Sequence, residues 1–256
     1  MGKVISCNIP KGGTCKTSSV QAIAEILSKD YDKKVCCIDT DSQCSLSIVS
    51  GIGDSDERNN LYSLLNRDCS IEECIYESTY YDIIPGSLKL STVDRTIQEI
   101  GKENFLKEHI QYIIQKYDYI LIDTAPALSL TNVMSATASD YILVTAEASY
   151  LSLSAIDQLY KTIQSVKKYL NNNLEMLGVL VVRYNYRAKI NRSILSTLEK
   201  QATNMHMRVF DSKIRSTVKI KEAQTQTIPL VDWGGNNCTA LEDYRQFVKE
   251  LIPMIQ

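Results

Sequence analysis

Short apolar runs alternate along this chain with longer segments in which apolar residues recur at helical spacing. The short runs are rich in Val, Ile and Leu and often end at Pro or an acidic residue, which is typical of strands buried on both faces of a sheet. We predict strands over residues 4–9, 34–39, 81–85, 117–123, 141–145 and 176–182, with strands or extended segments at 207–214 and 228–233.

The segments with helical spacing lie between these runs. We predict helices directly after the loop at 11–18 and over residues 61–65, 70–76, 88–115 (with a break at Gly101), 151–170, 190–200 and 240–252, the last ended by Pro253. The alternation predicts an α/β fold, a mostly parallel twisted sheet with helices on both faces. Residues 51–60 are polar and fit a surface loop, and no linker divides the chain, so we expect one domain over residues 1–256.

The length and composition of the chain fit a globular protein without membrane-spanning segments. The chain has 256 residues, 44% of them hydrophobic and 23% charged, with a formal net charge of −2. This length suffices for a well-buried α/β core. The apolar runs are too short to cross a membrane, and no secretory signal is visible at the N-terminus. We therefore expect a cytoplasmic protein.

The eight cysteines do not form a metal-binding pattern. No Cys-x-x-Cys pair occurs, and neither of the two histidines sits at a zinc spacing from them. Several fall inside apolar strand runs, where cysteine serves as a small buried hydrophobe. The cysteines are at positions 7, 15, 36, 37, 44, 69, 74 and 238, and we expect reduced, structural thiols at Cys7, Cys36 and Cys37, which lie in the strand runs.

The clearest chemical signal is the loop between the first strand and the first helix. Its residues are Lys11, Gly12, Gly13, Thr14, Cys15, Lys16, Thr17 and Ser18. A glycine-containing turn that opens a helix points backbone N–H groups and the positive end of the helix dipole at one spot, which suits a phosphate. Lys16 would add a charge on the outer phosphates, and the Thr17 hydroxyl would be a ligand for Mg²⁺.

Two further strands end on carboxylates. Asp39 and Asp41 follow the strand at 34–39, and Asp123 ends the strand at 117–123. Ligands of parallel sheets sit beyond the carboxyl ends of the strands, so these acids should face the phosphate loop. Carboxylates repel phosphates unless a cation lies between them, which again predicts Mg²⁺.

These motifs resemble the ParA/MinD family of deviant Walker A ATPases, and the small Soj-like ParA partition proteins most of all. The loop matches KGGxGK[ST] except at Cys15, IDTDSQCSLS is similar to the family's segment after the second strand, and YDYILIDTAP to its Walker B strand. The resemblance implies a P-loop NTPase fold, ATP and Mg²⁺ as cofactors, and contact of residues 11–18 with the nucleotide. It implies that Thr17, Asp39 and Asp123 serve the metal.

The same resemblance implies three catalytic residues. Lys16 is the P-loop lysine, Asp41 positions the attacking water, and Lys11 reaches the phosphates of a partner subunit in an ATP-bound homodimer. Phosphoryl transfer needs mainly positioning and charge neutralisation, which two lysines and Mg²⁺ supply.

Cys15 stands where the ordinary P-loop has glycine. If its backbone is left-handed, the side chain costs on the order of 1–2 kcal/mol and weakens nucleotide binding. Its place beside Lys16 at a helix N-terminus predicts a lowered thiol pKa and fast alkylation in the empty site. The alternative is that cysteine is simply small enough to fit.

A basic stretch indicates a partner. Residues 183–222 contain ten Lys or Arg and three acidic residues, within a slightly acidic chain. Such a stretch favours sequence-independent contact with a phosphate backbone. The candidate DNA-binding residues are Arg187, Lys189, Arg192, Arg215, Lys219 and Lys221.

We therefore expect a nucleoid-associated ATPase that partitions a plasmid, mobile element or chromosome region with a ParB-like stimulating partner. One alternative is a non-hydrolysing, ATP-bound positioning scaffold. A second is a MinD-like membrane cycle, but the tail YRQFVKELIPMIQ is neither strongly basic nor free of proline. An iron–sulfur relative is excluded because no cysteine lies between Cys74 and Cys238.

Overall fold

The computed structural model describes residues 2–53, 55–127, 129–233 and 238–255. One eight-stranded sheet runs through it in the order β3-β4-β2-β5-β1-β6-β7-β8. Every neighbouring pair is parallel except the short β3–β4 pair at one edge. The strands are β1 (Lys3–Cys7), β2 (Val35–Asp39), β3 (Tyr76–Glu77), β4 (Asp82–Ile84), β5 (Tyr119–Asp123), β6 (Tyr141–Glu147), β7 (Glu175–Tyr184) and β8 (Val209–Arg215).

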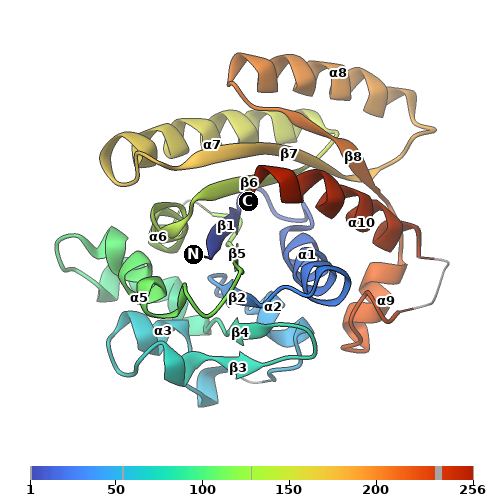
Figure 1. Ribbon diagram of the computed structural model, residues 1–256. Helices are drawn as coiled ribbons and strands as arrows, with labels where there is room; N and C mark the ends of the chain where they lie inside the picture. The colour runs from blue at the N-terminus through green and yellow to red at the C-terminus, as the bar shows by residue number, and fades with distance from the viewer. Residues whose placement is uncertain (1, 54, 128, 234–237, 256) are drawn as a thin grey trace.

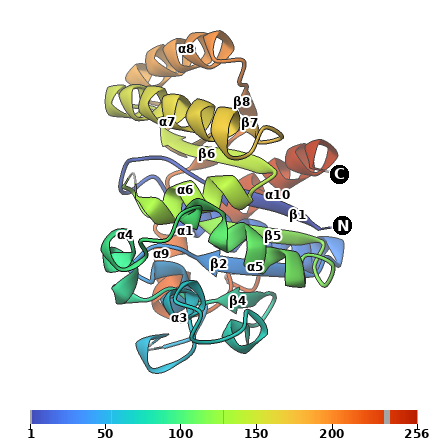
Figure 2. The ribbon, with the colours of Figure 1, turned by 90° about the vertical axis from the view of Figure 1, so that its left-hand side faces the viewer.

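Helices cover both faces of this sheet, as the two ribbon views show (Figures 1 and 2). α1 and α10 lie on one face, and α5, α6 and α7 on the other, with α8 outermost beside α7. The α-helices are α1 (Lys16–Tyr31), α2 (Ser45–Val49), α3 (Leu61–Leu65), α4 (Val93–Thr96), α5 (Phe105–Ile113), α6 (Leu130–Ala138), α7 (Tyr150–Tyr169), α8 (Lys189–Asn204), α9 (Lys219–Thr225) and α10 (Thr239–Leu251). Short 3₁₀ turns are η1 (Ser55–Glu57), η2 (Glu72–Cys74), η3 (Leu88–Thr92), η4 (Lys102–Asn104) and η6 (Ile252–Met254).

The central strands are apolar because both of their faces are covered. All five residues of β2 and all five of β5 are buried, and Ile38, Ile120 and Ile122 have no exposed surface. The predicted α/β fold with a mostly parallel sheet is confirmed.

The sheet topology determines where the acids and the loop meet. β1 lies between β5 and β6, and Cys7 at its end is level with Asp123 at the end of β5. Asp39 at the end of β2 is level with the same Asp123. The loop after β1 therefore opens beside both carboxylates at the carboxyl edge of the sheet, where open α/β sheets hold their ligands.

Several predicted elements differ from the observed ones. Residues 228–233 form turns instead of a strand, with the N–H groups of Asp232 and Trp233 both donating to the Pro229 carbonyl. The predicted helix at 88–115 is split into η3, α4, η4 and α5, and Gly101 lies at the break with φ +80°. The segment 70–76 holds the short turn η2 and, at Tyr76, the first residue of β3. Four short elements were not predicted from the sequence, because they are short or lack a clear hydrophobic period: α2, α6, α9 and β3.

Candidate functional site: a phosphate loop beside two buried carboxylates

The loop wraps around the N-terminus of α1. Lys16, 7% exposed, begins the helix, and its Nζ donates to the Lys11 carbonyl at 3.3 Å. Gly13 has φ +76°, a left-handed conformation that glycine adopts without strain. A Cβ added at Gly12 or Gly13 would meet no atom within 4 Å, so the space beside the loop is open. Lys16 is thus folded onto a loop whose inner side is accessible to a ligand.

Cys15 adopts the strained conformation that its glycine-like position suggests. Its φ and ψ are 57° and 28°, in the left-handed region, and it is the N-cap of α1 with no side-chain capping bond. The predicted lowering of its thiol pKa is wrong in direction. Burial raises the pKa of the Cys15 thiol, and the nearby charges of Arg183, Lys221 and Lys16 offset that effect only in part. The direction of the pKa shift therefore does not support an activated thiol, and fast alkylation of Cys15 in the empty site stays a prediction.

Asp39 and Asp123 are both fully buried at the ends of neighbouring strands. The carboxylate of Asp39 accepts hydrogen bonds from the Ser47 N–H and hydroxyl at 2.9 and 2.8 Å and from the Asp41 N–H at 3.1 Å. Burial raises its pKa to about 6. Burial, and next the charge of Asp39, raise the pKa of Asp123 to about 8. Asp39 and Asp123 are level on neighbouring strands and are shielded from water. Because like charges repel strongly in such surroundings, both carboxylates are ionised together only when a cation lies beside them.

The donor atoms at Asp123 fit a divalent cation. Its Oδ2 accepts a hydrogen bond from the Thr17 hydroxyl at 2.6 Å, while its Oδ1 is buried without a hydrogen-bond partner. Among the described residues no cluster of three or more His, Cys, Asp or Glu could enclose a metal. Mg²⁺ is the cation that suits this arrangement, because it takes few protein ligands and completes its shell with water and phosphate oxygens.

Asp41 lies at the rim of the site. Its Oδ1 accepts from the Gln43 N–H at 3.0 Å, and its carbonyl from the Cys44 N–H at 2.9 Å. Gly86 packs beneath it: a Cβ there would lie 3.0 Å from the Asp41 carbonyl oxygen and 3.2 Å from the Asp39 carboxyl carbon. The missing side chain at Gly86 thus allows the chain after β4 to pass directly under the two acids. The sequence placed Gly86 only in a Pro-Gly turn and did not predict this close contact.

Lys11 points away from the loop and toward the start of α7. Its Nζ donates to the hydroxyls of Ser149 and Ser152 at 3.0 and 3.2 Å and lies 3.9 Å from Glu147 Oε2. Glu147 also accepts from Arg183 at 3.0 Å. None of these four residues, the three partners of Lys11 and Arg183, was singled out from the sequence for this site, because they lie more than a hundred residues from Lys11.

A cavity of about 950 Å³ opens over the loop. Its walls include Gly12 to Ser18, Asp41 and Pro126, and across from them residues of the β8–α9 connection. Gln224 of α9 joins the two walls, since its amide donates to Ser18 Oγ at 3.2 Å and to Gln21 Oε1 at 3.0 Å. The volume and the mixture of polar and apolar walls suit a nucleotide-sized ligand.

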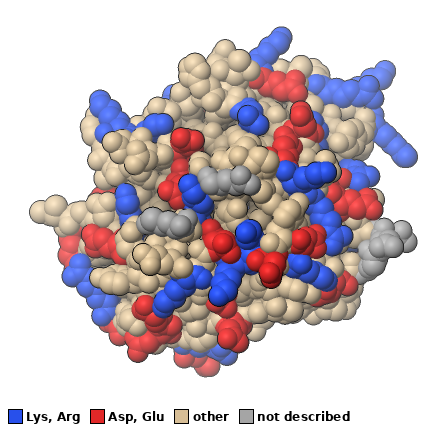
Figure 3. All heavy atoms as spheres, viewed as in Figure 1, with Lys and Arg blue, Asp and Glu red and all other residues tan. Residues whose placement is uncertain are grey.

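The six candidate DNA-binding residues do not form one helix face. Arg187 precedes α8, which carries Lys189 and Arg192, while α9 carries Lys219 and Lys221. Arg215 ends β8, where its guanidinium is held by Asp243 at 2.8 Å and by Glu242 at 3.5 Å, so its charge is already paired. Arg215 and Lys221 line the cavity. Figure 3 shows Lys and Arg gathered over α8 at the upper right of this view and mixed with acids elsewhere.

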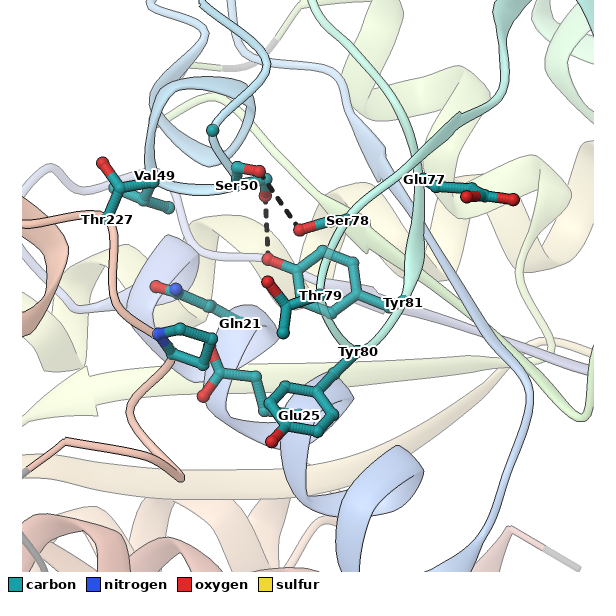
Figure 4. Close-up of a pocket in the computed structure, with 12 residues that line it drawn as sticks. Gln21, Glu25, Val49, Ser50, Glu77, Ser78, Thr79, Tyr80, Tyr81 and Thr227 are labelled. Atoms are coloured by element: carbon teal, nitrogen blue, oxygen red, sulfur yellow. Dashed lines mark hydrogen bonds between the residues drawn. The ribbon is translucent and has the colours of Figure 1, made fainter.

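A second, smaller cavity of about 280 Å³ lies beside α1 (Figure 4). Gln21 and Glu25 form its inner wall, and the segments 49–51 and 77–81 face them. The Ser50 and Tyr81 hydroxyls are hydrogen-bonded at 2.8 Å across it. Burial raises the pKa of Glu25 to about 7, although its carboxylate accepts from the Val231 N–H at 3.2 Å.

Comparison with known proteins is consistent with this geometry. A family described as an AAA domain (AAA_31) matches residues 2–176. The sporulation initiation inhibitor protein Soj of Bacillus subtilis is 28% identical over 254 residues, which cover 98% of each chain. Among the described residues no helix is long and apolar enough to cross a membrane.

Solved structures share the fold. The ATP complex of a substituted McdA from Cyanothece superposes with a TM-score of 0.88 at 23% identity, covering 100% of this chain and 98% of that one. A Mycobacterium smegmatis structure described as cobyrinic acid a,c-diamide synthase with bound ADP and magnesium gives a TM-score of 0.85 at 21% identity, covering 98% and 94%. At these identities the superpositions establish the arrangement of the chain and no more.

Proposed function

Because the chain belongs to the AAA_31 family of AAA domains, as a ParA/MinD-type ATPase with a deviant Walker A loop, we propose that it is an ATP- and Mg²⁺-dependent molecular switch. It dimerises on ATP, binds DNA without sequence preference and partitions a plasmid, mobile element or chromosome region. One observation carries the nucleotide part of this proposal. Asp123 pairs with Thr17 below the phosphate loop and leaves one buried carboxylate oxygen without a partner.

The chain's own residues supply positioning and charge. The loop N–H groups and the α1 dipole hold the phosphates, and Lys16 exchanges the Lys11 carbonyl for a phosphate oxygen. Thr17, Asp123 and Asp39 are the residues that would hold Mg²⁺, Thr17 through its hydroxyl and the two acids through their carboxylates. The bound cation supplies neutralisation of the phosphate charge. Asp41, at the rim, orients the attacking water.

The homodimer is supported by the surface around the site. Lys11 is bound at the rim by Ser149 and Ser152, where a facing copy of the chain could receive it. Large apolar side chains near this rim are exposed, which is typical of an interface. They are Ile48 (59% exposed), Tyr150 (67%), Leu151 (73%) and Val218 (67%).

DNA binding is supported by the basic residues of α8, α9 and the loop before α8. The ParB-like stimulating partner rests on the resemblance to the ParA partition proteins. Phosphate contacts by lysine and arginine are independent of sequence and weaken with salt. Arg187, Lys189, Arg192, Lys219 and Lys221 are the residues that we assign to this surface. Arg215 is left out of this set because Asp243 and Glu242 already neutralise it.

Three substitutions test the nucleotide chemistry. Lys16→Ala should abolish ATP binding, because a buried charge next to the phosphates is lost. Asp41→Ala should keep binding and trap the ATP dimer, with turnover lowered by roughly 100-fold, the scale of a lost positioning group. Lys11→Ala should weaken dimerisation and hydrolysis more than nucleotide binding by the monomer.

The measurements are nucleotide titration, sedimentation with and without ATP, and phosphate release with and without DNA. Hydrolysis by Asp41→Ala at the parent rate would remove Asp41 from its assigned role. An ATP dimer of the parent that releases no phosphate even with DNA and partner would identify a positioning scaffold instead of an ATPase.

A further inference from the structure

Two cysteines that are remote from the nucleotide site in the sequence lie in direct contact. Cys69 precedes the turn η2 and Cys74 is its last residue, between α3 and β3, and their Sγ atoms are 3.1 Å apart. All eight cysteines of the chain are free thiols in this structure. A disulfide bond needs about 2.0 Å between the sulfurs, so a small movement of the two side chains would close it.

The segment between them is held in the shape that brings them together. The Glu73 carboxylate accepts from the Ser70 N–H at 2.8 Å and from the Ser70 hydroxyl at 3.0 Å. The Cys74 N–H donates to the Ile71 carbonyl at 3.1 Å. The chain is therefore already folded into a tight turn, and most of the ordering that a disulfide would require is done by the fold.

The two thiols differ in access. Cys74 is fully buried in the core with Leu61 and Leu64, whereas Cys69 is partly exposed. Burial raises the pKa of both thiols, and the hydrogen bond from Cys74 opposes this rise at Cys69. Cys69 is thus the thiol that a dissolved reagent meets first, and Cys74 stands directly behind it.

We propose that Cys69 and Cys74 form a reversible dithiol–disulfide site whose oxidant is a small-molecule disulfide of the glutathione class. The Cys69 thiolate attacks one sulfur of the reagent, forming a mixed disulfide and releasing one glutathione thiolate, which takes up the Cys69 proton. The Cys74 thiolate then attacks Cys69 Sγ, forming the internal disulfide and releasing the second glutathione with the second proton. The protein loses two electrons and two protons, and the reagent gains them.

The digestion pattern of the chain makes this reaction easy to follow. Cys69 and Cys74 are the two cysteines of one tryptic peptide, residues 68–89, while Cys36, Cys37 and Cys44 lie in another, residues 35–58. Full-length protein is incubated with oxidised glutathione, quenched in acid, alkylated without reduction and digested. We expect peptide 68–89 to lose two hydrogens and resist alkylation, and dithiothreitol to reverse both changes. Peptide 35–58 serves as the internal control and should stay reduced.

Two variants separate the steps. In Cys74→Ser the glutathione adduct on Cys69 should accumulate to roughly ten times its level in the parent, because the resolving thiol is gone. In Cys69→Ser the buried Cys74 should stay reduced. Circular dichroism spectra matching that of the parent show that each variant is folded. Two results with the parent protein alone would overturn the proposal. One is a stable glutathione adduct on peptide 68–89, and the other is a peptide 68–89 that stays reduced while free small thiols in the same tube are oxidised.

Discussion

At the residue scale, Cys15 carries a side chain where the backbone favours glycine. Its φ of 57° lies in the left-handed region, which costs an L-residue with a Cβ about 1–2 kcal/mol. Cys15→Gly should remove this strain and, after the entropy that glycine adds to the unfolded chain, raise the free energy of unfolding by up to about 1 kcal/mol. Cys15→Ala is the matched control, because it keeps the Cβ and the strain. Urea unfolding of the three proteins measures the difference, and equal stability of the Gly and Ala variants contradicts the strain.

Glu25 is a second residue whose surroundings change its chemistry. It is 1% exposed, and burial raises its pKa from 4.5 to about 7. A raised carboxyl pKa means that the folded protein binds the proton more tightly than the unfolded chain. The free energy of unfolding therefore falls as the pH rises from the unfolded pKa of 4.5 to the folded pKa of about 7, and it is lowest above the folded pKa. Glu25→Gln removes this penalty. Its stability relative to the parent should therefore grow between pH 5 and pH 8 by roughly 2 kcal/mol.

Thermal or urea unfolding at the two pH values tests this expectation. The other buried acids, Asp39 and Asp123, titrate in both proteins and cancel in the comparison. Glu77→Gln, which removes the charge of an exposed acid that lines the same cavity, is the matched control. A pH-independent difference between Glu25→Gln and the parent would show that Glu25 has an ordinary pKa.

At the scale of elements, the pairing of β7 with its neighbours depends on Gly178. Its φ is +143°, and a Cβ there would lie 2.6 Å from the Arg208 carbonyl oxygen. The register between β6 and β7 also shifts at this point, where Leu143 pairs with Gly178 and Leu177 is passed over. Glycine in a strand often marks such a bulge or a close approach of backbones.

Gly178→Ala should therefore lower the free energy of unfolding by on the order of 2–4 kcal/mol, because the clash is with backbone and cannot be relieved by a side-chain rotation. Gly101→Ala is the matched control: Gly101 also has a positive φ, +80°, but a Cβ there meets nothing within 4 Å. It should cost only the conformational strain, about 1 kcal/mol. If urea unfolding shows that Gly178→Ala and Gly101→Ala lower the free energy of unfolding equally, the backbone at Arg208, just before β8, moves aside easily.

At the scale of the whole molecule, we assign DNA binding to residues of two helices, α8 and α9, and of the loop before α8. The ATP-bound protein should bind duplexes of unrelated sequence equally, with an affinity that falls steeply as salt rises. Arg187→Glu combined with Lys219→Glu should abolish this binding and keep ATP-dependent dimerisation. The charge-matched control is Lys167→Glu with Lys168→Glu, which changes two exposed lysines at the far end of α7. Fluorescence anisotropy at several salt concentrations compares them, and equal binding by both double variants would place the DNA surface elsewhere.

Features that depend on neighbouring residues could be predicted from the amino-acid sequence. Apolar runs that end on acids predicted β2 and β5 with Asp39 and Asp123, and the Gly-Gly turn before Lys16 predicted the phosphate loop. These are local patterns, and a parallel sheet brings their carboxyl ends to one edge whatever the details of packing. The same reasoning failed at 228–233, where the apolar composition resembled a strand but the segment pairs with none of the strands in the described part of the chain.

Which side chains meet, and how strongly they are shielded from water, could not be predicted, because both depend on how the whole chain packs. Lys11 lies against Ser149 and Ser152, Arg215 is neutralised by Asp243, and Cys74 stands behind Cys69. The Cys15 pKa is raised although its neighbours in the sequence predicted the opposite, because desolvation depends on everything packed around the thiol. Contacts between residues far apart in the chain, and the dielectric surroundings that they create, exist only once the sheet has assembled and its helices have closed over it.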